Sequence, residues 1–285
     1  MKIVESCQEM TNLSLTAQKS GRRVALVPTM GALHEGHLSL LKIASRHCDF
    51  MVMSVFVNPT QFGPKEDFSK YPRPFHNDCA LAELAGCDCV FAPKPEEMYP
   101  ENYNTYVSVE NITGALCGAS RPAHFKGVTT VVLKLFNIVS PQIAVFGQKD
   151  AQQVIVIKRM VQDLNMSLQL ITAPIVREND GLAMSSRNVY LSEDERGEAP
   201  LIYKSLMEAK ALYDSGERGA QTIKKRVQSI LETGRMIKSE YIEVADTVCI
   251  SPLEKIDRPA LMAIACRTNE SGTRLIDNII LGGDL

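Results

Sequence analysis

The sequence lacks the long apolar run that a membrane-spanning helix needs. Its most apolar stretch, residues 50–57, is interrupted only by Ser54 and is far shorter than the roughly 18 residues that cross a bilayer. The N-terminus also lacks the apolar segment of a secretory signal, because Glu5 comes before such a segment can form. These absences predict a cytoplasmic protein with no membrane partner.

An excess of positive charge is also absent. The chain carries 31 Lys and Arg against 33 Asp and Glu, a net charge of -2. Proteins that bind nucleic acid without regard to sequence normally carry a basic excess, so a nucleic-acid partner is not expected, although a local basic pocket for a phosphate is still allowed. With 285 residues, 45% of them hydrophobic, the chain is long enough for about two folded domains.

Among its eight cysteines the sequence has no C-x-x-C spacing, the spacing typical of zinc knuckles and thioredoxin-like redox sites. The closest pair is Cys87 and Cys89. An even number of cysteines would suit disulfide pairing, but a chain of this size with an ordinary core rarely needs disulfides. We therefore expect reduced, structural cysteines.

Residues 1–175 alternate between short apolar runs and longer helical patterns. The apolar runs predict strands at residues 24–27, 50–57, 89–91 and 143–146. The helical patterns cover residues 37–46, 75–85, 128–139 and 151–164. Almost wholly apolar strands separated by helices indicate a parallel sheet covered on both faces, a Rossmann-like α/β domain whose ligands lie beyond the carboxyl ends of the strands.

Residues 176–285 follow a different pattern. A polar loop at residues 177–188 precedes two amphipathic helices, expected at residues 200–213 and 220–233. Three strand-like runs follow at residues 241–244, 260–266 and 274–281. Two helices followed by three strands predict a smaller α+β domain with an antiparallel sheet.

The strongest chemical signal lies directly after the first predicted strand. His34 and His37 are three residues apart, so a helix that starts here places both imidazoles on one face. Gly31 and Gly36 allow a close approach of backbone and phosphate, and a helix start offers N–H groups to an anion. Two alternatives are histidines that merely pack at the turn and, more weakly, a metal site without a third ligand.

This segment contains neither a Walker-type phosphate loop nor a G-x-G-x-x-G fingerprint. The form His-x-Gly-His instead resembles the signature of the nucleotidylyltransferases and the class I aminoacyl-tRNA synthetases. Such folds usually carry a second, basic phosphate loop late in the nucleotide domain. Met184, Ser185, Ser186 and Arg187 fit that role, because two hydroxyls and a guanidinium together engage several phosphate oxygens. Without the first motif, a solvated loop would be the default interpretation.

Over most of its length the chain resembles the pantothenate synthetase (pantoate–β-alanine ligase) family. The matching stretches are residues 28–40, 56–62, 71–73, 121–128, 134–139, 146–153 and 176–188. The resemblance implies an AMP-forming ligase that uses ATP to convert (R)-pantoate to an enzyme-bound pantoyl adenylate, with release of pyrophosphate. The amine of β-alanine then attacks the acyl carbon and gives pantothenate and AMP.

The resemblance also implies two sets of ATP-binding residues. The first set follows the first strand: Met30, Gly31, Ala32, Leu33, His34, Glu35, Gly36 and His37. The second set lies later in the chain: Gly147, Gln148, Lys149, Asp150, Val176, Met184, Ser185, Ser186 and Arg187. Within these sets, His34, His37 and Lys149 are the expected catalytic residues, and Asp150 is expected to accept from the ribose hydroxyls.

For the other substrates, the resemblance implies that Gln61 and Gln153 hold pantoate, with Gln61 also bordering β-alanine. Arg121 and His124 are expected on the β-alanine side, and Asp78 is the one candidate contact for a metal. The triphosphate chemistry implies Mg²⁺. A homodimer and a C-terminal lid at residues 176–285 are further expectations. Without the matched motifs, Gln61 and Gln153 would each be interpreted as a surface amide. Lys149 and Asp150 would be interpreted as a solvated helix start.

Two other functions fit parts of the pattern. An adenylyl- or cytidylyltransferase would share the two phosphate motifs but would not need the paired glutamines, and it would release a stable dinucleotide instead of AMP. A non-catalytic nucleotide sensor on the same fold would bind ATP without releasing pyrophosphate, and such proteins usually lose one of the motifs.

Overall fold

The structure, a computed structural model, describes residues 1–64 and 66–285. By their contacts they form two compact units. The N-terminal unit comprises Met1–Gly114, Gly118–Gly147 and Val156–Ala173, and the C-terminal unit comprises Ala115–Cys117, Gln148–Ile155 and Pro174–Leu285. The C-terminal unit therefore includes residues 115–117 and 148–155 as well as the segment expected from the sequence.

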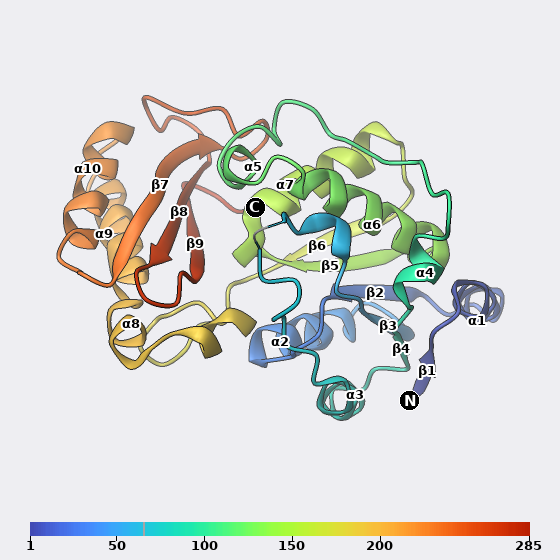
Figure 1. The fold of residues 1–285 in the computed structure, drawn as a ribbon. Helices are drawn as coiled ribbons and strands as arrows, with labels where there is room; N and C mark the ends of the chain where they lie inside the picture. The colour runs from blue at the N-terminus through green and yellow to red at the C-terminus, as the bar shows by residue number, and fades with distance from the viewer. Residues whose placement is uncertain (65) are drawn as a thin grey trace. The chain divides into compact units, whose positions relative to one another are not determined.

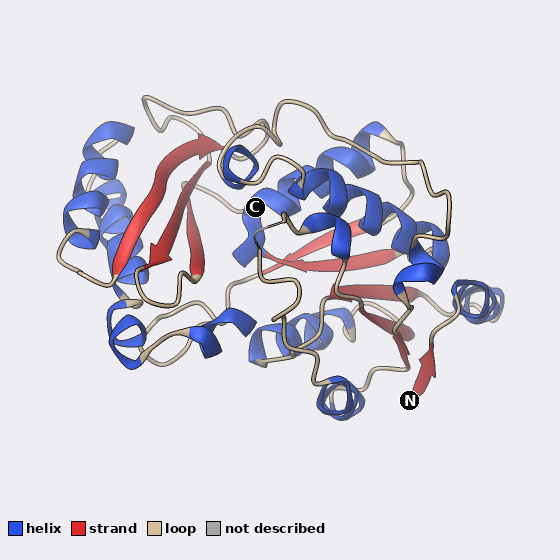
Figure 2. Ribbon diagram, in the orientation of Figure 1, coloured by secondary structure: helices blue, strands red, loops and turns tan. Residues whose placement is uncertain are grey.

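A six-stranded, wholly parallel sheet forms the centre of the N-terminal unit, with the strand order β1-β4-β3-β2-β5-β6 (Figure 1, Figure 2). Its strands are β1 (Lys2–Val4), β2 (Val24–Thr29), β3 (Phe50–Val55), β4 (Cys89–Phe91), β5 (Ile143–Gly147) and β6 (Gln169–Ala173). The Rossmann-like sheet expected from the sequence is thus confirmed.

Helices cover both faces of this sheet (Figure 1). Helices α2 (Glu35–Ala44) and α3 (Phe75–Leu84) lie on one face, and α1 (Cys7–Lys19) and α6 (His124–Val139) on the other. Under α2 and α3, a buried cluster includes Val27, Leu41, Met53, Val90 and Val145. Helix α7 (Ala151–Asp163) follows β5 in the chain.

The sheet has its topological switch point at β2. This strand pairs with β3 on one side and with β5 on the other. From β2 the chain runs outward to β3 and β4, whereas β5 and β6 extend the sheet in the opposite direction. Ligands of open α/β sheets bind beyond the carboxyl ends of the strands at such a point. These ends are Thr29 of β2 and Gly147 of β5.

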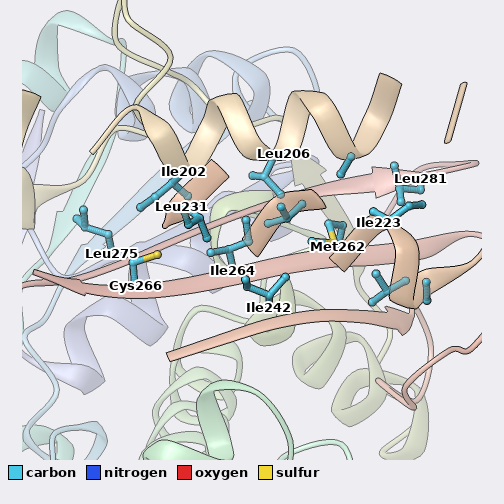
Figure 3. Close-up of a cluster of buried hydrophobic side chains, with 14 of the residues drawn as sticks. Ile202, Leu206, Ile223, Leu231, Ile242, Met262, Ile264, Cys266, Leu275 and Leu281 are labelled. Carbon is cyan, nitrogen blue, oxygen red and sulfur yellow. The ribbon is translucent and has the colours of Figure 1, made fainter. Parts of the chain in front are cut away.

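The C-terminal unit contains a three-stranded antiparallel sheet of β7 (Ile237–Asp246), β8 (Ala260–Thr268) and β9 (Arg274–Leu281). Helices α9 (Leu201–Asp214) and α10 (Ala220–Leu231) pack on it. Figure 3 shows the buried side chains of this core in close-up. Their buried side chains, among them Leu206 and Ile223, meet Met262 and Ile264 of the central strand. The α+β architecture expected for this part of the chain is confirmed.

Six short helices complete the described structure: η1 (Pro59–Gln61), α4 (Pro95–Met98), α5 (Cys117–Ser120), η2 (Gln148–Asp150), η3 (Ser186–Tyr190) and α8 (Glu193–Glu198). None of the helices in the described part of the chain is long and apolar enough to span a membrane. All eight cysteines are free, as expected.

Several boundaries differ from the sequence expectation, and two of these differences have a clear physical reason. Strand β2 does not stop before Pro28 but continues to Thr29. Its pairing with β5 ends at Leu26, so Pro28 lies on a strand that is locally an edge on that side, where a missing N–H is tolerated. Helix α6 begins at His124, earlier than the expected residue 128, and buries Phe125 in its first turn.

Candidate active site

The turn that follows β2 has an unusual backbone. Gly31 and Ala32 both have positive φ angles, 83° and 51°. The Gly31 N–H donates to the Thr29 hydroxyl at 3.2 Å, and that hydroxyl donates to the Ser54 carbonyl at 2.7 Å. A Cβ atom added at Gly31 would lie 2.8 Å from Asp78 Oδ2 and 3.1 Å from Val55 Cγ1. Only glycine fits this position without displacing a neighbour.

Asp78, near the start of α3, binds the backbone of the segment that follows β2. Its Oδ2 accepts the Ala32 N–H at 2.9 Å, and its Oδ1 accepts the Leu33 N–H at 2.8 Å. The Asp78 residue is 1% exposed. Both oxygens of this carboxylate are therefore bonded to the backbone of the motif.

His34 and His37 cap the start of helix α2 with their side chains. His34 Nδ1 accepts the Gly36 N–H at 3.1 Å, and His37 Nδ1 accepts the His34 N–H at 3.3 Å. This reciprocal arrangement is a capping box built from two imidazoles, whose ring centroids are 4.1 Å apart. Because each Nδ1 accepts a hydrogen bond, each neutral ring carries its proton on Nε2 and can donate from that side.

Gln61 lies at the end of the short helix η1 and is 9% exposed. Its amide nitrogen donates to the sulfur of Met30 at 3.1 Å, and its amide oxygen accepts from Asn58 at 3.2 Å. Asn58 also donates to the Gly127 carbonyl at 3.2 Å. A Cβ atom at Gly127 would collide with the Thr60 carbonyl, so this glycine allows α6 to pack against η1. The contact with Met30 brings Gln61 to the histidine motif.

Arg121 and His124 hold the backbone next to Gln61. Arg121 Nη2 and His124 Nδ1 contact the Gln61 carbonyl oxygen at 3.2 and 2.9 Å. A carbonyl oxygen only accepts, so the His124 proton lies on Nδ1, and Nε2 of the neutral ring accepts from Arg121 Nη1 at 3.2 Å. Arg121 also donates to both oxygens of Glu66 at 2.6 and 2.5 Å. Burial raises the pKa of Glu66, but the bonds and charge of Arg121 outweigh it and hold that pKa below its usual value.

In the C-terminal unit, strand β9 supports the turn that contains Lys149. The Asn278 amide donates to the Gln148 and Lys149 carbonyls, both at 3.0 Å, and its oxygen accepts from the Gln148 side chain at 3.2 Å. Lys149 Nζ lies 3.9 Å from Asp150 Oδ2, and its side chain is 23% exposed. The turn is therefore held through its backbone carbonyls, while the side chain of Lys149 stays partly exposed.

Gln152 and Gln153 follow in the first turn of α7 and have different environments. Gln152 is 6% exposed, accepts the Cys117 N–H at 3.0 Å and donates to the Ala115 carbonyl at 2.8 Å. Gln153 is only partly buried. Gln152 thus has a structural position, whereas Gln153 retains the accessibility that a substrate-binding residue requires.

The segment that leads from Val176 to the predicted basic loop contacts the same strand β9 at a different residue, Asp277. Arg177 donates to both oxygens of Asp277 at 2.6 and 2.9 Å, and the Asp277 carboxylate also accepts the Asn278 N–H at 2.7 Å. Neighbouring residues Asp277 and Asn278 therefore connect the segment that starts at Val176 to the turn that contains Lys149.

Within that segment, the Met184 N–H donates to the Val176 carbonyl at 3.0 Å. Ser185 caps η3 by accepting the Arg187 N–H at 3.2 Å. Ser186 and Arg187 are only partly buried. The loop thus holds its hydroxyls and guanidinium on an ordered helical turn.

The structure therefore gathers the predicted residues into two sets. Residues 30–37, Gln61, Arg121 and His124 share contacts in the N-terminal unit, and residues 148–150 and 176–187 share strand β9 in the C-terminal unit. In the described part of the chain, no group of three His, Cys, Asp or Glu side chains could hold a metal ion. The metal contact assigned to Asp78 stays a prediction.

Sequence reasoning missed the residues that support the site. Asn58, Asp277 and Asn278 are each at most 3% exposed. Asn58 and Asn278 bond to residues that carry a predicted role, Gln61 and Gln148, and Asp277 bonds to Arg177 next to Val176. Buried polar residues of this kind leave no periodic signal. The exception is Asn58, which precedes Pro59 within the matched stretch 56–62, so the sequence offers a signal for its importance.

Comparison with known proteins gives full-length matches. The family described as Pantoate-beta-alanine ligase matches residues 2–280. A curated pantothenate synthetase from Thermoanaerobacter sp. is 54% identical over 285 residues, which cover both chains completely. One from Acetivibrio thermocellus is 53% identical over 281 residues, 99% of each chain.

Solved structures agree with these matches. A pantothenate synthetase from Thermus thermophilus superposes with a TM-score of 0.93 at 40% identity, over 99% of this chain and all of that one. A pantoate-beta-alanine ligase from Francisella tularensis, complexed with beta-gamma ATP and beta-alanine, superposes with a TM-score of 0.80 at 31% identity, over 98% of this chain and 97% of that one.

Proposed function

The chain belongs to the pantoate–β-alanine ligase family and catalyses the ATP-dependent condensation of pantoate with β-alanine, and we propose that the two imidazoles at the start of α2 carry its adenylation step. The observation that supports this assignment is the shared tautomer of His34 and His37. Backbone N–H groups occupy both Nδ1 atoms, so both Nε2–H groups are donors.

The reaction has two bond exchanges. A pantoate carboxylate oxygen attacks the α-phosphorus of ATP, the bond from that phosphorus to the bridging oxygen breaks, and pyrophosphate leaves. The β-alanine amine then attacks the acyl carbon, loses a proton, and AMP leaves with the electrons of the acyl–oxygen bond. The first step needs no base, because a carboxylate is already a nucleophile. Its catalysis is positioning and stabilisation of charge.

Donors at the start of α2 fit the adenylation step. The N-terminal end of a helix carries a partial positive charge, which favours negatively charged phosphate oxygens. A neutral imidazole there already has an Nε2–H that donates to such an oxygen without a change in its protonation state. In this proposal His37 and His34 meet the charge that grows on the α- and β-phosphate oxygens. Lys149 supplies a positive charge to the phosphates, and Asp150 accepts from the ribose.

For the acid substrate, we assign Gln61 and Gln153 to pantoate. Each amide has a donor and an acceptor that suit the hydroxyls and carboxylate of a small dihydroxy acid. Arg121 and His124, expected on the β-alanine side, contribute in this proposal by fixing the Gln61 backbone. The bidentate pair with Glu66 neutralises the Arg121 charge, which favours this supporting role over direct attraction of a carboxylate.

The nucleotide substrate in this proposal is ATP with Mg²⁺. Magnesium usually binds to substrate phosphates and few protein ligands. The described residues do not form a protein cage for it, so no step is assigned to a resident ion. The lid role of residues 176–285, the homodimer and the cytoplasmic location remain predictions; the eight free cysteines suit a reducing compartment.

An isotope-exchange assay tests the two-step scheme. Labelled pyrophosphate should enter ATP when pantoate and Mg²⁺ are present and β-alanine is absent. Addition of β-alanine should give pantothenate and AMP. Exchange that requires β-alanine would contradict the adenylate, a stable dinucleotide product would indicate a nucleotidylyltransferase, and ATP binding without pyrophosphate release would indicate a sensor.

The same assay tests the basic loop. Arg187→Ala should abolish exchange, because it removes the guanidinium that this proposal assigns to the phosphates. Arg235→Ala, at an exposed residue of the same unit, is the matched control and should exchange at the wild-type rate. Full exchange in Arg187→Ala would remove the loop from phosphate binding.

A further inference from the structure

Asp78 is a buried carboxylate to which the reaction scheme gives no chemical role. It is 1% exposed, and each oxygen accepts one backbone N–H of the histidine motif, from Ala32 and from Leu33. Hydrogen bonds to an ionised carboxylate are stronger than those between neutral groups. The residue therefore acts on the turn that precedes His34.

That turn needs an external restraint. Two consecutive residues have left-handed φ angles, and one of them, Ala32, has a Cβ atom that disfavours this conformation. Consecutive N–H groups in such a turn form a cradle for an anion. Here the carboxylate of Asp78 already fills the cradle, so the ATP contacts expected of Ala32 and Leu33 must come from atoms other than these two N–H groups.

We propose that Asp78 is a positioning residue for adenylation: by filling the anion cradle of the turn after β2 it fixes the direction in which His34 and His37 donate, and it does not bind a metal. This inference rests on the proposed function of the two imidazoles. His34 directly follows Leu33, whose side chain is 8% exposed and packed in the core under α2. The turn is thus anchored on both sides of its backbone, by a carboxylate and by a buried side chain.

The metal alternative fits the geometry less well. Both Asp78 oxygens already accept N–H groups, and the residue is sealed from solvent. In the part of the chain that is described, no second and third carboxylate, thiol or imidazole gathers beside it to make a metal site. Positioning and metal binding predict different responses to Mg²⁺, which makes the two separable.

The first test is Asp78→Asn. The amide keeps the size of the side chain but has only one acceptor, so its NH₂ group must face one backbone N–H. A misplacement of about 1 Å costs on the order of 100-fold in rate, and we expect that loss in kcat of pantoate-dependent pyrophosphate exchange. The KM for pantoate and the Mg²⁺ concentration at half-maximal rate should stay at their wild-type values.

A matched control is Asp246→Asn in the C-terminal unit. Asp246 is also buried, at 6% exposure, and accepts backbone N–H groups from Val248, Cys249 and Ser251. This variant loses a comparable bond in a turn that has no assigned chemistry. Its exchange rate should equal that of the wild type at a temperature where both variants are folded.

Gly31→Ala tests the same turn without altering the carboxylate's charge. The added Cβ would lie 2.8 Å from Asp78 Oδ2 and must displace it. We expect a fall in kcat with an unchanged Mg²⁺ requirement. If both residues act through one turn, the double variant should be no slower than the worse single variant, because coupled residues are not additive. This variant also carries the test if Asp78→Asn does not fold.

Different results would contradict the positioning role of Asp78 and the proposed function. A wild-type kcat in Asp78→Asn or Gly31→Ala, recovery of the Asp78→Asn rate at high Mg²⁺, or additive losses in the double variant would each overturn the positioning role. Failure of the proposed function itself would appear earlier and differently, as an absence of pantoate-dependent exchange in the unaltered protein.

Discussion

The guanidinium of Arg177 forms a bidentate ion pair with the carboxylate of Asp277, which is 3% exposed. Burial raises the pKa of Asp277, and the bonds from Arg177 oppose this shift. Asp277 precedes Asn278, the residue that holds the turn containing Lys149. The ion pair is therefore part of the support of the predicted ATP site.

We expect Arg177→Met to lower the free energy of unfolding by about 3–5 kcal/mol, because it leaves a buried carboxylate without its partner. An unpaired Asp277 would have a folded-state pKa above its unfolded value. The loss should then be small below the unfolded value, grow as the pH rises from the unfolded to the folded-state value, and level off above it. Urea titrations at several pH values measure this.

The control for that prediction is Arg226→Met. Arg226 pairs with Glu208 on the surface, with side chains 50% and 42% exposed, and such pairs contribute about 0–1 kcal/mol. Equal losses of unfolding free energy in the two variants would show that the buried pair contributes no more stability than the surface pair.

His37→Ala should lower the rate of adenylate formation by about 100-fold or more, since one preorganised donor at the developing charge is lost. ATP binding should change far less. Single-turnover rates at saturating ATP, with a separate ATP titration, measure the two effects. His47→Ala, outside the motif, is the control, and a near-wild-type rate in His37→Ala would exclude His37 from the mechanism.

Gln153→Ala should weaken pantoate use by about 1–3 kcal/mol, the cost of a substrate polar group left unpaired, while ATP binding stays close to normal. Gln152→Ala is the neighbouring contrast. It removes the bonds to Ala115 and Cys117 and should lower the melting temperature more than Gln153→Ala does. Loss of ATP affinity with normal pantoate affinity in Gln153→Ala would show that the assignment is wrong.

Glu195 makes the stability of the C-terminal unit depend on pH in the acid range. Burial raises its pKa, but hydrogen bonds from Ser271, Ser192 and Thr268 outweigh that effect and lower the pKa to about 2. Its unfolded value is near 4.3. A lowered folded-state pKa contributes stability that is present above the unfolded value and is lost as the pH falls through the folded value.

The melting temperature of the wild type should therefore exceed that of Glu195→Gln at neutral pH, and the difference should shrink as the pH falls from about 4.3 to about 2. Thermal melts across this range test the prediction. Glu232→Gln, at an exposed position in the same unit, should show no such convergence. A difference that is constant with pH would contradict the role of the Glu195 charge.

Buried apolar patterns were the predictable part of the fold. Strand β4 and helix α7 lie within a residue of their expected bounds, because their burial is continuous or periodic. Helix α1 was not anticipated: its buried side chains are only Met10, Ser14 and Ala17, which give little apolar contrast. Strand β6 was missed because it is a sheet edge on which only Ala173 is buried.

The candidate site was predictable where residues lie close together in sequence. His34 and His37 lie three residues apart, and together with Gly31, Gly36 and their position after the first predicted strand they indicate a helix start. Asp78 and Asn278 act on residues 46 and 130 positions away, and no local pattern encodes contacts of that length. The sequence therefore allows a prediction of the residues that meet the substrates, but it does not reveal most of the residues that hold them in place.

A turn whose N–H groups are satisfied by its own chain is ordered before any nucleotide arrives. Because the backbone torsions of this turn are already fixed, ATP binding loses little free energy in ordering them. More of the interaction between enzyme and ATP therefore contributes to the affinity. The same completeness limits adaptation, because a larger side chain at Gly31 would have to displace a carboxylate that lies 2.8 Å from the added atom. The turn before α2 thus has its backbone hydrogen bonds formed within the protein itself, without a contribution from the nucleotide.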